Sequence, residues 1–268
     1  VRATEPITTV RIHLTNSDQI LVAQVPVANG KAKTEGTCSI DGVPGTAARI
    51  DLDWSDITGT VCGKLLPTGN AKDTFKIGQK SYEVSLVDAG NPLVFIRAES
   101  LGMTGTETPA QIEGNPALMA AIEKIRAKAA VCFGLVKRGE DAYEQSPYNP
   151  FFAIVSAPAD YRCSNGNSVR KGDADLVSRL LFMHHMHKTY PITGTVCTGA
   201  AMKIPGSIPW ELMDPSSRQK ENLRIGHPAG VLEVQARAQG EGNSIKMESI
   251  RVYRTARMIM DGTVYVKQ

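Results

Sequence analysis

A Thr-Gly-Thr segment at residues 193–195 has the residue types most suited to binding an anion. It precedes a run of small residues, 196–202, that is typical of a helix tightly enclosed by other elements. In such a helix the first-turn N–H groups and the positive end of the dipole would face a carboxylate. The same residues could form an ordinary cap on a buried helix, since such caps are common. The candidate binding residues are Thr193, Gly194 and Thr195.

Two Gly-Asn dipeptides, Gly69-Asn70 and Gly90-Asn91, mark sharp turns. The second separates two apolar runs that are typical of buried strands. Glycine there permits a positive φ, and asparagine adds a short amide that can bond the backbone or a ligand. A polar turn between buried strands is a natural place to hold a small polar ligand. Asn91 is therefore a candidate substrate contact, with a self-bonded turn amide as the alternative.

Metal-binding chemistry is not indicated. His184, His185 and His187 lie close in sequence, but on the helix expected over 173–187 only the first and last share a face. The cysteines form no CxxC pair or other metal-ligand spacing; they are Cys38, Cys62, Cys132, Cys163 and Cys197. We predict no metal and no organic cofactor.

Strands mixed with a few helices predict an α+β fold rather than a doubly wound sheet. Apolar alternation predicts early strands at 10–14, 20–27 and 48–54, a strand on each side of Gly90-Asn91, a short buried strand at 151–155, and closing strands at 230–235, 245–253 and 258–266. Helices are expected over 116–133, 173–187 and 196–202, the first capped by Asn115 with a proline at its first position. The domain boundary is expected near residues 76–82.

Composition describes an ordinary globular protein, with 42% hydrophobic and 21% charged residues in 268. A net charge of +3, carried by scattered Lys and Arg, does not favour nucleic acid. No apolar run approaches a membrane span, and no signal-peptide pattern is present. An odd number of cysteines indicates reduced thiols, so we predict a cytoplasmic location. The chain starts at Val1 and soon enters a strand pattern, which indicates the later part of a longer protein.

Seven motifs in order resemble the 2-methylaconitate cis-trans isomerase (PrpF) family. They are Ile40-Asp-Gly-Val-Pro-Gly-Thr46, Gly63-Lys-Leu-Leu-Pro-Thr-Gly-Asn70, Val84-Ser-Leu-Val-Asp-Ala-Gly-Asn-Pro92, the segment from Met183 to His187, Ile192-Thr-Gly-Thr195, Ile225-Gly-His-Pro228, and Arg254-Thr-Ala-Arg257 with Met260-Asp-Gly262. Each motif alone is weak, but together they cover essentially the whole chain in register.

The resemblance implies the diaminopimelate epimerase fold, with two similar domains that each wrap a curled sheet around a central helix. Residues 1–80 would then be the remainder of the first domain, 81–253 the second domain, and 254–268 a final strand returning to the first. The family's Gly-Gly-Thr-Ser-Lys-Gly and Asn-Cys-Gly-Asn motifs, which carry its catalytic lysine and cysteine, do not occur here. We therefore assign no catalytic residue within this chain.

The resemblance also strengthens the binding candidates. Asn91 matches a turn whose asparagine binds ligand in the related epimerases, Asn149 enters another strand in a similar way, and His187 matches a family histidine. Thr193 stands where those epimerases place a second catalytic cysteine. Cys197, one turn inside the helix, is expected to be a small buried hydrophobe.

Two positions depart from the family pattern. The family has Pro-Lys where this chain has Pro150-Phe151, and that change removes a cation that could pair with a carboxylate. Ala229 replaces a serine and removes a hydroxyl donor. Arg254 and Arg257 are expected to form structural ion pairs or to face solvent, and we leave them outside the site.

We predict an isomerase of small unsaturated di- or tricarboxylic acids, with 2-methylaconitate as the first candidate substrate. Methylitaconate Δ-isomerase and 4-oxalomesaconate tautomerase are rivals within the class. The implied reaction abstracts a proton beside a carboxylate-activated double bond and returns it elsewhere. A catalytically inactive binding or accessory domain is the alternative from another class, and Thr193 argues against an amino-acid epimerase. The expected partners are a small carboxylic-acid substrate and, for self-association, a homodimer, without nucleic acid or membrane.

Overall fold

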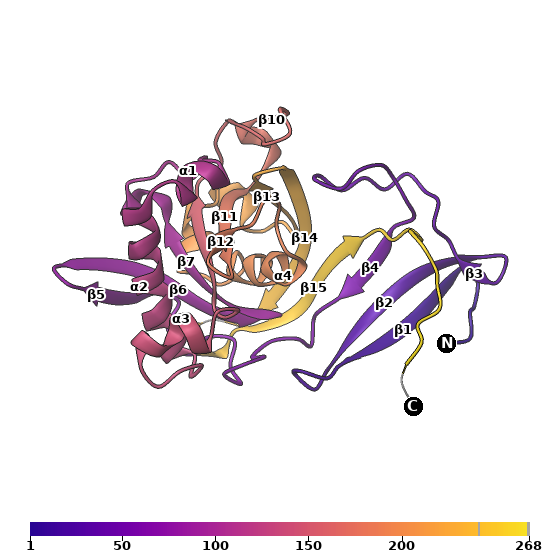
Figure 1. Cartoon of the computed structure of the whole chain (residues 1–268), viewed down its shortest axis with the longest axis horizontal. Coiled ribbons are helices and arrows are strands. Elements are labelled where there is room, and N and C mark those ends of the chain that lie inside the picture. Colours follow the sequence, from indigo (N-terminus) through magenta and orange to yellow (C-terminus); the bar gives the residue numbers. More distant parts are fainter. Residues whose placement is uncertain (241, 267–268) are drawn as a thin grey trace.

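One long mixed sheet forms the frame of the molecule (Figure 1), seen in a computed structural model that describes residues 1–240 and 242–266. In spatial order its strands are β1 (Ile7–Leu14), β2 (Gln19–Ala28), β4 (Ile50–Asp53), β15 (Lys246–Arg254), β14 (Gly230–Gln239), β13 (Asn222–His227), β11 (Leu176–Phe182), β8 (Phe151–Ser156), β7 (Asn91–Arg97), β6 (Lys80–Ala89) and β5 (Asp73–Ile77). Short strands β3 (Lys31–Ala32) and β12 (His185–Met186) pair with β2 and β11, while β9 (Tyr161–Arg162) and β10 (Ser168–Val169) pair separately. The sheet divides into an open lobe, β1 to β4, and a curled lobe, β5 to β14.

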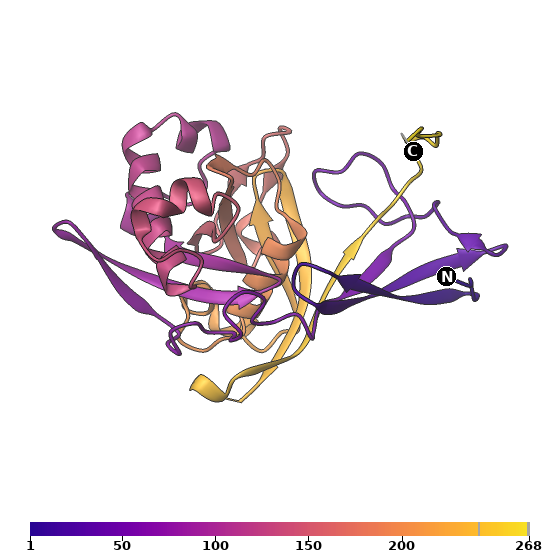
Figure 2. The ribbon, with the colours of Figure 1, turned by 60° about the horizontal axis from the view of Figure 1, so that its bottom comes forward.

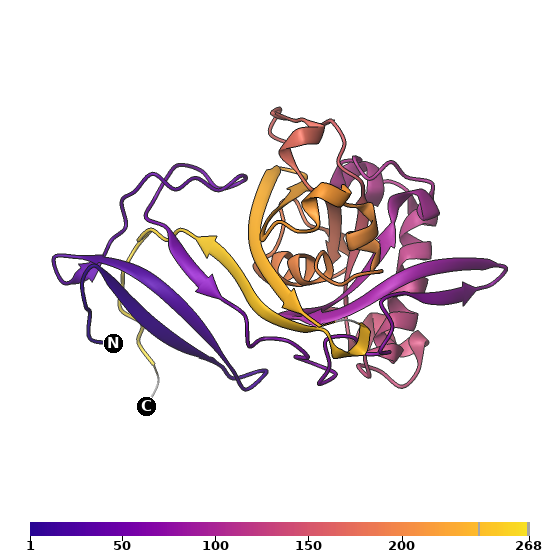
Figure 3. The same cartoon turned by 180° about the vertical axis from the view of Figure 1, so that it is seen from behind.

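The curled lobe wraps around helix α4 (Ile192–Ala201), as Figure 3 shows from behind. Every α4 residue from 194 to 201 is buried. Small residues make this fit: a Cβ on Gly199 would lie 2.6 Å from Cγ2 of Val234 on β14. Tight enclosure holds the N-terminus of α4 in a fixed place beside the strand ends.

The outer face of the curled sheet is covered by α2 (Pro116–Cys132), whose start at an Asn115 cap and a first-turn proline confirms that part of the expectation. Ile122, Ile125 and Ala129 pack there against strands β6 to β8. The remaining helices are α1 (Pro109–Glu113), α3 (Ala142–Gln145) and α5 (Ile208–Leu212), with 3-10 turns at Ala98–Leu101, Gly139–Asp141, Lys171–Asp173, Pro215–Ser217 and Gly242–Ser244. None of the helices in the described ranges is long and apolar enough to cross a membrane.

The helix expected over 173–187 is wrong. Residues Leu176–Phe182 form strand β11, which pairs with β8 on one side and with β13 on the other. Both faces of β11 are buried, so apolar residues stand at adjacent positions, in Leu176-Val177 and Leu180-Leu181-Phe182, on either side of Ser178 and Arg179. Such a pattern satisfies helical spacing by coincidence, because a strand covered on both faces needs no alternation.

Strand β15 joins the two lobes (Figure 2). Its earlier part pairs with β14, and its end, from Arg251 to Arg254, pairs with β4. The strand expected over 254–268 does not continue beyond Arg254: residues 255–266 form no strand, and 267–268 lie outside the described residues. A strand needs a hydrogen-bonding neighbour, and β4 ends its pairing at Ile50.

The boundary expected between residues 80 and 81 lies at the start of β6, within the β5–β6 hairpin, whose two strands pair along their length. Phe75 of β5 packs in the same hydrophobic cluster as Val84 of β6 and Ile96 of β7. The hairpin therefore belongs wholly to the curled lobe, because one core covers both of its strands.

Candidate functional site

The N-terminus of α4 offers unpaired backbone donors. Pro191 is the N-cap, and within the described residues the N–H groups of Ile192, Thr193 and Gly194 have no recorded acceptor. Thr195 differs, since its N–H and its hydroxyl both donate to the Pro191 carbonyl, at 2.8 and 3.0 Å. Thr193 and Gly194 can therefore face a ligand, whereas the polar groups of Thr195 serve the helix itself.

The Gly90-Asn91 turn lies against this helix end. A Cβ on Gly90, whose φ is +71°, would lie 3.2 Å from Val196 Cγ1 and 3.5 Å from the Thr193 carbonyl oxygen. Asn91 then opens β7, and its Nδ2 donates to Oδ1 of Asn149 at 2.8 Å. Three sequence candidates, Asn91, Asn149 and Thr193, are thus brought together.

Parallel pairing of β7 with β8 explains why two asparagines 58 positions apart meet. Asn91 begins β7 and Asn149 lies two residues before β8, and parallel neighbours place those ends side by side. Asn149 is further fixed through its carbonyl, which accepts from Ser146 Oγ at 2.7 Å and from Arg126 Nη1 at 3.1 Å. Oδ1 of Asn91 and Nδ2 of Asn149 have no recorded partner among the described residues and remain available for a ligand.

His187 lies after β12, in a loop rather than at a helix end. Its N–H donates to the Leu180 carbonyl at 2.7 Å, and its Nδ1 accepts from the Thr189 N–H at 3.1 Å. His184 instead stacks on Tyr143, and His185 is largely exposed. The three histidines have separate surroundings, and no group of three potential metal ligands occurs in the described ranges.

Two residues left outside the predicted site are notable in the structure. His227 is completely buried at the end of β13, and its Nε2 has no partner in the described chain. Arg254 is part-buried and has no carboxylate partner among the described residues; its Nη1 donates to the Tyr253 carbonyl at 2.9 Å. Of the two outcomes expected for Arg254, an ion pair or a solvent-facing side chain, the ion pair does not form within the described residues.

The thiols nearest the site are not activated. Cys197 is fully buried, as expected, and donates to the Val87 carbonyl at 3.3 Å. Burial raises the pKa of Cys197 well above its ordinary value. Burial, reinforced by the Asp88 carboxylate, raises the pKa of Cys62 to about 11. Neither thiol is a thiolate at neutral pH, so neither can act as a base there.

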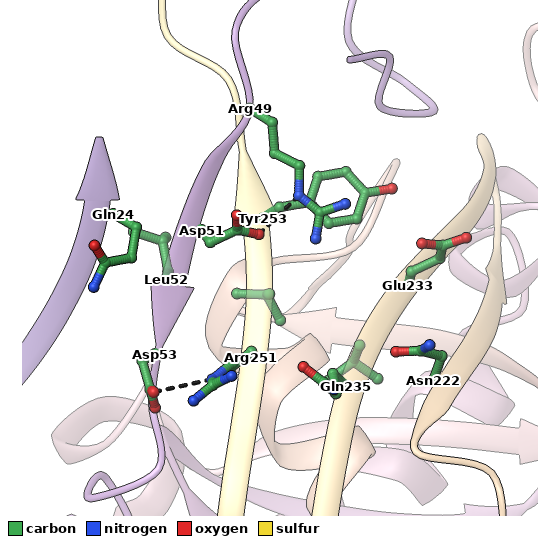
Figure 4. A pocket seen from close by; sticks show the side chains of 12 residues that line it. Gln24, Arg49, Asp51, Leu52, Asp53, Asn222, Glu233, Gln235, Arg251 and Tyr253 are labelled. Atoms are coloured by element: carbon green, nitrogen blue, oxygen red, sulfur yellow. Dashed lines mark hydrogen bonds and ion pairs between the residues drawn. The ribbon is translucent and has the colours of Figure 1, made fainter. Parts of the chain in front are cut away.

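A hollow of about 400 Å³ lies elsewhere, between β4, β15 and β14 (Figure 4). Its charged residues are two arginines, Arg49 and Arg251, and three carboxylates, Asp51, Asp53 and Glu233. The arginines are already paired, Arg49 with Asp51 at 2.7 Å and Arg251 with Asp53 at 3.1 Å. A net negative lining repels a polycarboxylate, so the chemistry favours the α4 end as the site.

Buried His227 predicts a loss of stability in mild acid. Burial, with the charges of Arg179, His187 and Arg254, lowers its pKa from 6.5 to about 3. Between these values only the unfolded chain binds the proton, so stability falls as pH falls. We expect the free energy of unfolding to drop by about 2 kcal/mol from pH 7 to pH 5, measured by urea denaturation. The pKa of His187 is also lowered by burial, which adds in the same direction.

The control for this pH effect is the His227→Asn variant, in which most of the drop should disappear. Glu107 and Asp175 have lowered pKa values too, but carboxyl groups lose their contribution at more acidic pH. An equal drop in His227→Asn would show that other groups cause it.

A curled sheet around a central helix, with polar strand ends and a helix N-terminus in one place, defines the diaminopimelate epimerase-like α+β fold. The chain belongs to the PrpF family of isomerases: the family model described as "PrpF protein" matches residues 1–267. Both the fold and the family predicted from the motifs are confirmed.

Named relatives agree with this assignment. The chain is 46% identical to "3-methylitaconate isomerase" of Eubacterium barkeri over 100% of its own length and 70% of that protein. It is 34% identical to "2-methyl-aconitate isomerase" of Shewanella oneidensis, covering 96% of the chain and 65% of that protein. A crystal structure of methylitaconate-delta-isomerase matches 99% of the chain and 68% of its own, with 46% identity and a TM-score of 0.89.

Proposed function

We propose that this chain forms the carboxylate-binding side of an isomerase that moves a double bond or changes its geometry in a small unsaturated di- or tricarboxylic acid. The observation that carries the proposal is the free N-terminus of α4 beside the Asn91–Asn149 pair. Backbone donors and amides in one place suit a substrate whose negative charge spreads when a proton leaves.

The proton-transfer base is not assigned to these residues. The motifs that hold the family's lysine and cysteine do not occur in this sequence, and Cys62 and Cys197 have raised pKa values. The residues described here bind and orient the substrate and stabilise its developing charge. No step of this proposal requires a bound cofactor.

Among the candidate substrates, a dicarboxylate of the methylitaconate type is favoured over the tricarboxylate 2-methylaconitate. Phe151, two residues after Asn149, stands where the resemblance implies a lysine, and it packs edge-on against Phe182 with the ring centroids 5.0 Å apart. Ala229, buried as well, offers no side-chain donor. Fewer cationic and donor groups suit a substrate with one carboxylate fewer. The higher identity to the relative named for methylitaconate points the same way.

Proton NMR in D2O tests this function on the protein in its natural full length. We expect 3-methylitaconate to isomerise with deuterium incorporation, faster than 2-methylaconitate or 4-oxalomesaconate. Turnover of 2-methylaconitate alone would reject the preferred substrate. Ligand-induced thermal stabilisation without turnover or exchange would reject the isomerase and favour the inactive binding domain.

The Phe151→Lys variant tests the choice of substrate. A cation beside Asn149 should shift the ratio of kcat/KM values toward 2-methylaconitate by about tenfold, which corresponds to one added charge contact. Tyr148→Lys is the matched control, because Tyr148 is exposed and its ring lies 6.4 Å from Phe182. A ratio is independent of how much enzyme folds, so an unchanged ratio in Phe151→Lys would contradict the assignment.

The cellular setting belongs to the same proposal. All five cysteines are free, which supports a cytoplasmic protein. The proposed partners are the small carboxylic-acid substrate and a second copy of the chain. Analytical ultracentrifugation of the full-length protein tests the homodimer, and a monomer at all concentrations would reject it.

A further inference from the structure

His227 is held in one tautomer by its own turn. It ends β13, and the chain reverses over residues 227–230 into β14. Its Nδ1 accepts the N–H of Ala229 at 3.2 Å. An imidazole nitrogen that accepts a backbone N–H carries no proton, so in the neutral ring the proton is on Nε2.

The Nε2–H group of His227 is therefore a buried donor without an acceptor in the described chain. The side chain is 0% exposed, and Nε2 itself makes no recorded hydrogen bond. Burying such a donor costs free energy comparable to a lost hydrogen bond, and native proteins rarely leave one unpaired. The His227 ring centroid lies 6.5 Å from that of Tyr190, which directly precedes the Pro191 cap of α4, so an unpartnered donor here indicates an acceptor on the ligand.

His187 repeats the arrangement. Its Nδ1 accepts the N–H of Thr189, also two residues ahead, at 3.1 Å, and no partner is recorded for its Nε2 within the described ranges. The two histidines thus share the same tautomer and the same free donor, although they come from different loops.

The two histidine turns are neighbours. A Cβ placed on Gly42 of the open lobe would lie 2.7 Å from Thr189 Cγ2 and 3.2 Å from Ala229 Cβ, so both turns pack against the same glycine. Burial, followed by the charges of Arg179, His187 and Arg254, lowers the pKa of His227, so these three groups lie near its ring. Arg179 donates to the carbonyls of Thr106, Glu107 and Ser178, so neither arginine has a carboxylate partner among the described residues.

We propose that His187 and His227 act as a pair of neutral Nε2–H donors that bind one carboxylate of the substrate once the turns over 187–189 and 227–230 part to admit it, while the α4 N-terminus binds the other. This inference rests on the proposed function and names the groups that select a dicarboxylate. Neutral donors hold a carboxylate without competing for a proton, and the two unpaired arginines add favourable potential. Only three residues separate His187 from the Pro191 cap, so the two anion sites adjoin along the chain.

Nitrogen-15 NMR of the full-length protein labelled at histidine tests the tautomers directly. The probe is methylsuccinate, an unreactive saturated dicarboxylate, with butyrate as the single-carboxylate control. We expect both imidazoles to carry the proton on Nε2, and both Nε2–H signals to shift with methylsuccinate but much less with butyrate. A proton on Nδ1 in either ring, or no response to methylsuccinate, would overturn the proposal.

Two matched variants separate binding from structure. His227→Asn keeps an acceptor near the position of Nδ1 for the Ala229 N–H but lacks the Nε2 donor, whereas His227→Gln places an amide donor near Nε2. We expect His227→Asn to weaken methylsuccinate binding about tenfold or more, and His227→Gln to restore most of it. His187→Asn and His187→Gln repeat the test at a less buried position.

Outcomes for this inference and for the proposed function are distinguishable. Equal binding by His227→Asn and the natural protein would reject the donor role, and equal weakening in both variants would show a structural role only. Histidine signals that respond to methylsuccinate in a protein that isomerises nothing would leave the donor pair standing and reject the enzyme.

Discussion

Replacing Arg126 with methionine is expected to lower the free energy of unfolding by about 3 kcal/mol. Arg126 is 1% exposed, and its guanidinium donates to the carbonyls of Ala142, Ser146 and Asn149 and to both carboxylate oxygens of Glu123. Methionine fills much of the volume but leaves those carbonyls without their donor. Urea denaturation followed by circular dichroism measures the change, with the slope m expected to stay constant.

The same variant should weaken ligand binding, because Arg126 helps to fix Asn149 beside Asn91. Arg138→Met is the matched control. Arg138 pairs with Glu140 and Asp141 on the surface, 67% exposed, and surface pairs contribute little. If the two variants lost the same stability, the three carbonyl contacts of Arg126 would be shown to contribute nothing measurable.

Replacing Gly230 with alanine is expected to cost about 3 kcal/mol of stability and to displace the loop of residues 40–46. Gly230 has a φ of +147°, and a Cβ there would lie 2.1 Å from Asp41 Oδ2. Asp41 comes from the open lobe and accepts the N–H of Val231 at 2.7 Å. The substitution therefore strains the backbone and breaks a contact between the lobes beside His227.

Two control variants separate the backbone strain in Gly230→Ala from its steric clash with Asp41. Gly78→Ala, at the β5–β6 turn, also has a positive φ but open space around its Cβ, and it should cost only about 1 kcal/mol. Adding Asp41→Gly to Gly230→Ala should recover the part due to the clash and leave the part due to strain. A double variant as unstable as Gly230→Ala alone would contradict the clash.

The sequence predicted those helix starts and turns that depend on interactions between residues a few positions apart. The Asn115 cap, the first-turn proline of α2 and the glycine of the Gly90-Asn91 turn are examples, because each acts on the backbone within a few positions of itself. The prediction was wrong for strand β11, because its apolar spacing also fits a helix. Only its pairing with β8 and β13 decides between helix and strand.

The candidate site shows the same division. Thr193 and Gly194 were predicted as residues that precede a helix over 196–202, but α4 begins at Ile192 and both lie in its first turn. Asn91 was predicted because a turn has a sequence signature. The role of Asn149 as partner of Asn91 could not be predicted without the parallel pairing of β7 and β8. His227 and Arg254 were missed because burial and the absence of a partner are properties of the packed chain.

The sequence by itself determined the family and the α+β class, because these depend on residue order and short-range backbone chemistry. Only the tertiary structure decided which polar groups keep a free donor. Thr195 lost that role to the Pro191 carbonyl, whereas the Nε2 atoms of His187 and His227 kept it. The physical reason is that a hydrogen bond is assigned by the neighbours that folding brings within reach, and those neighbours come from distant parts of the chain.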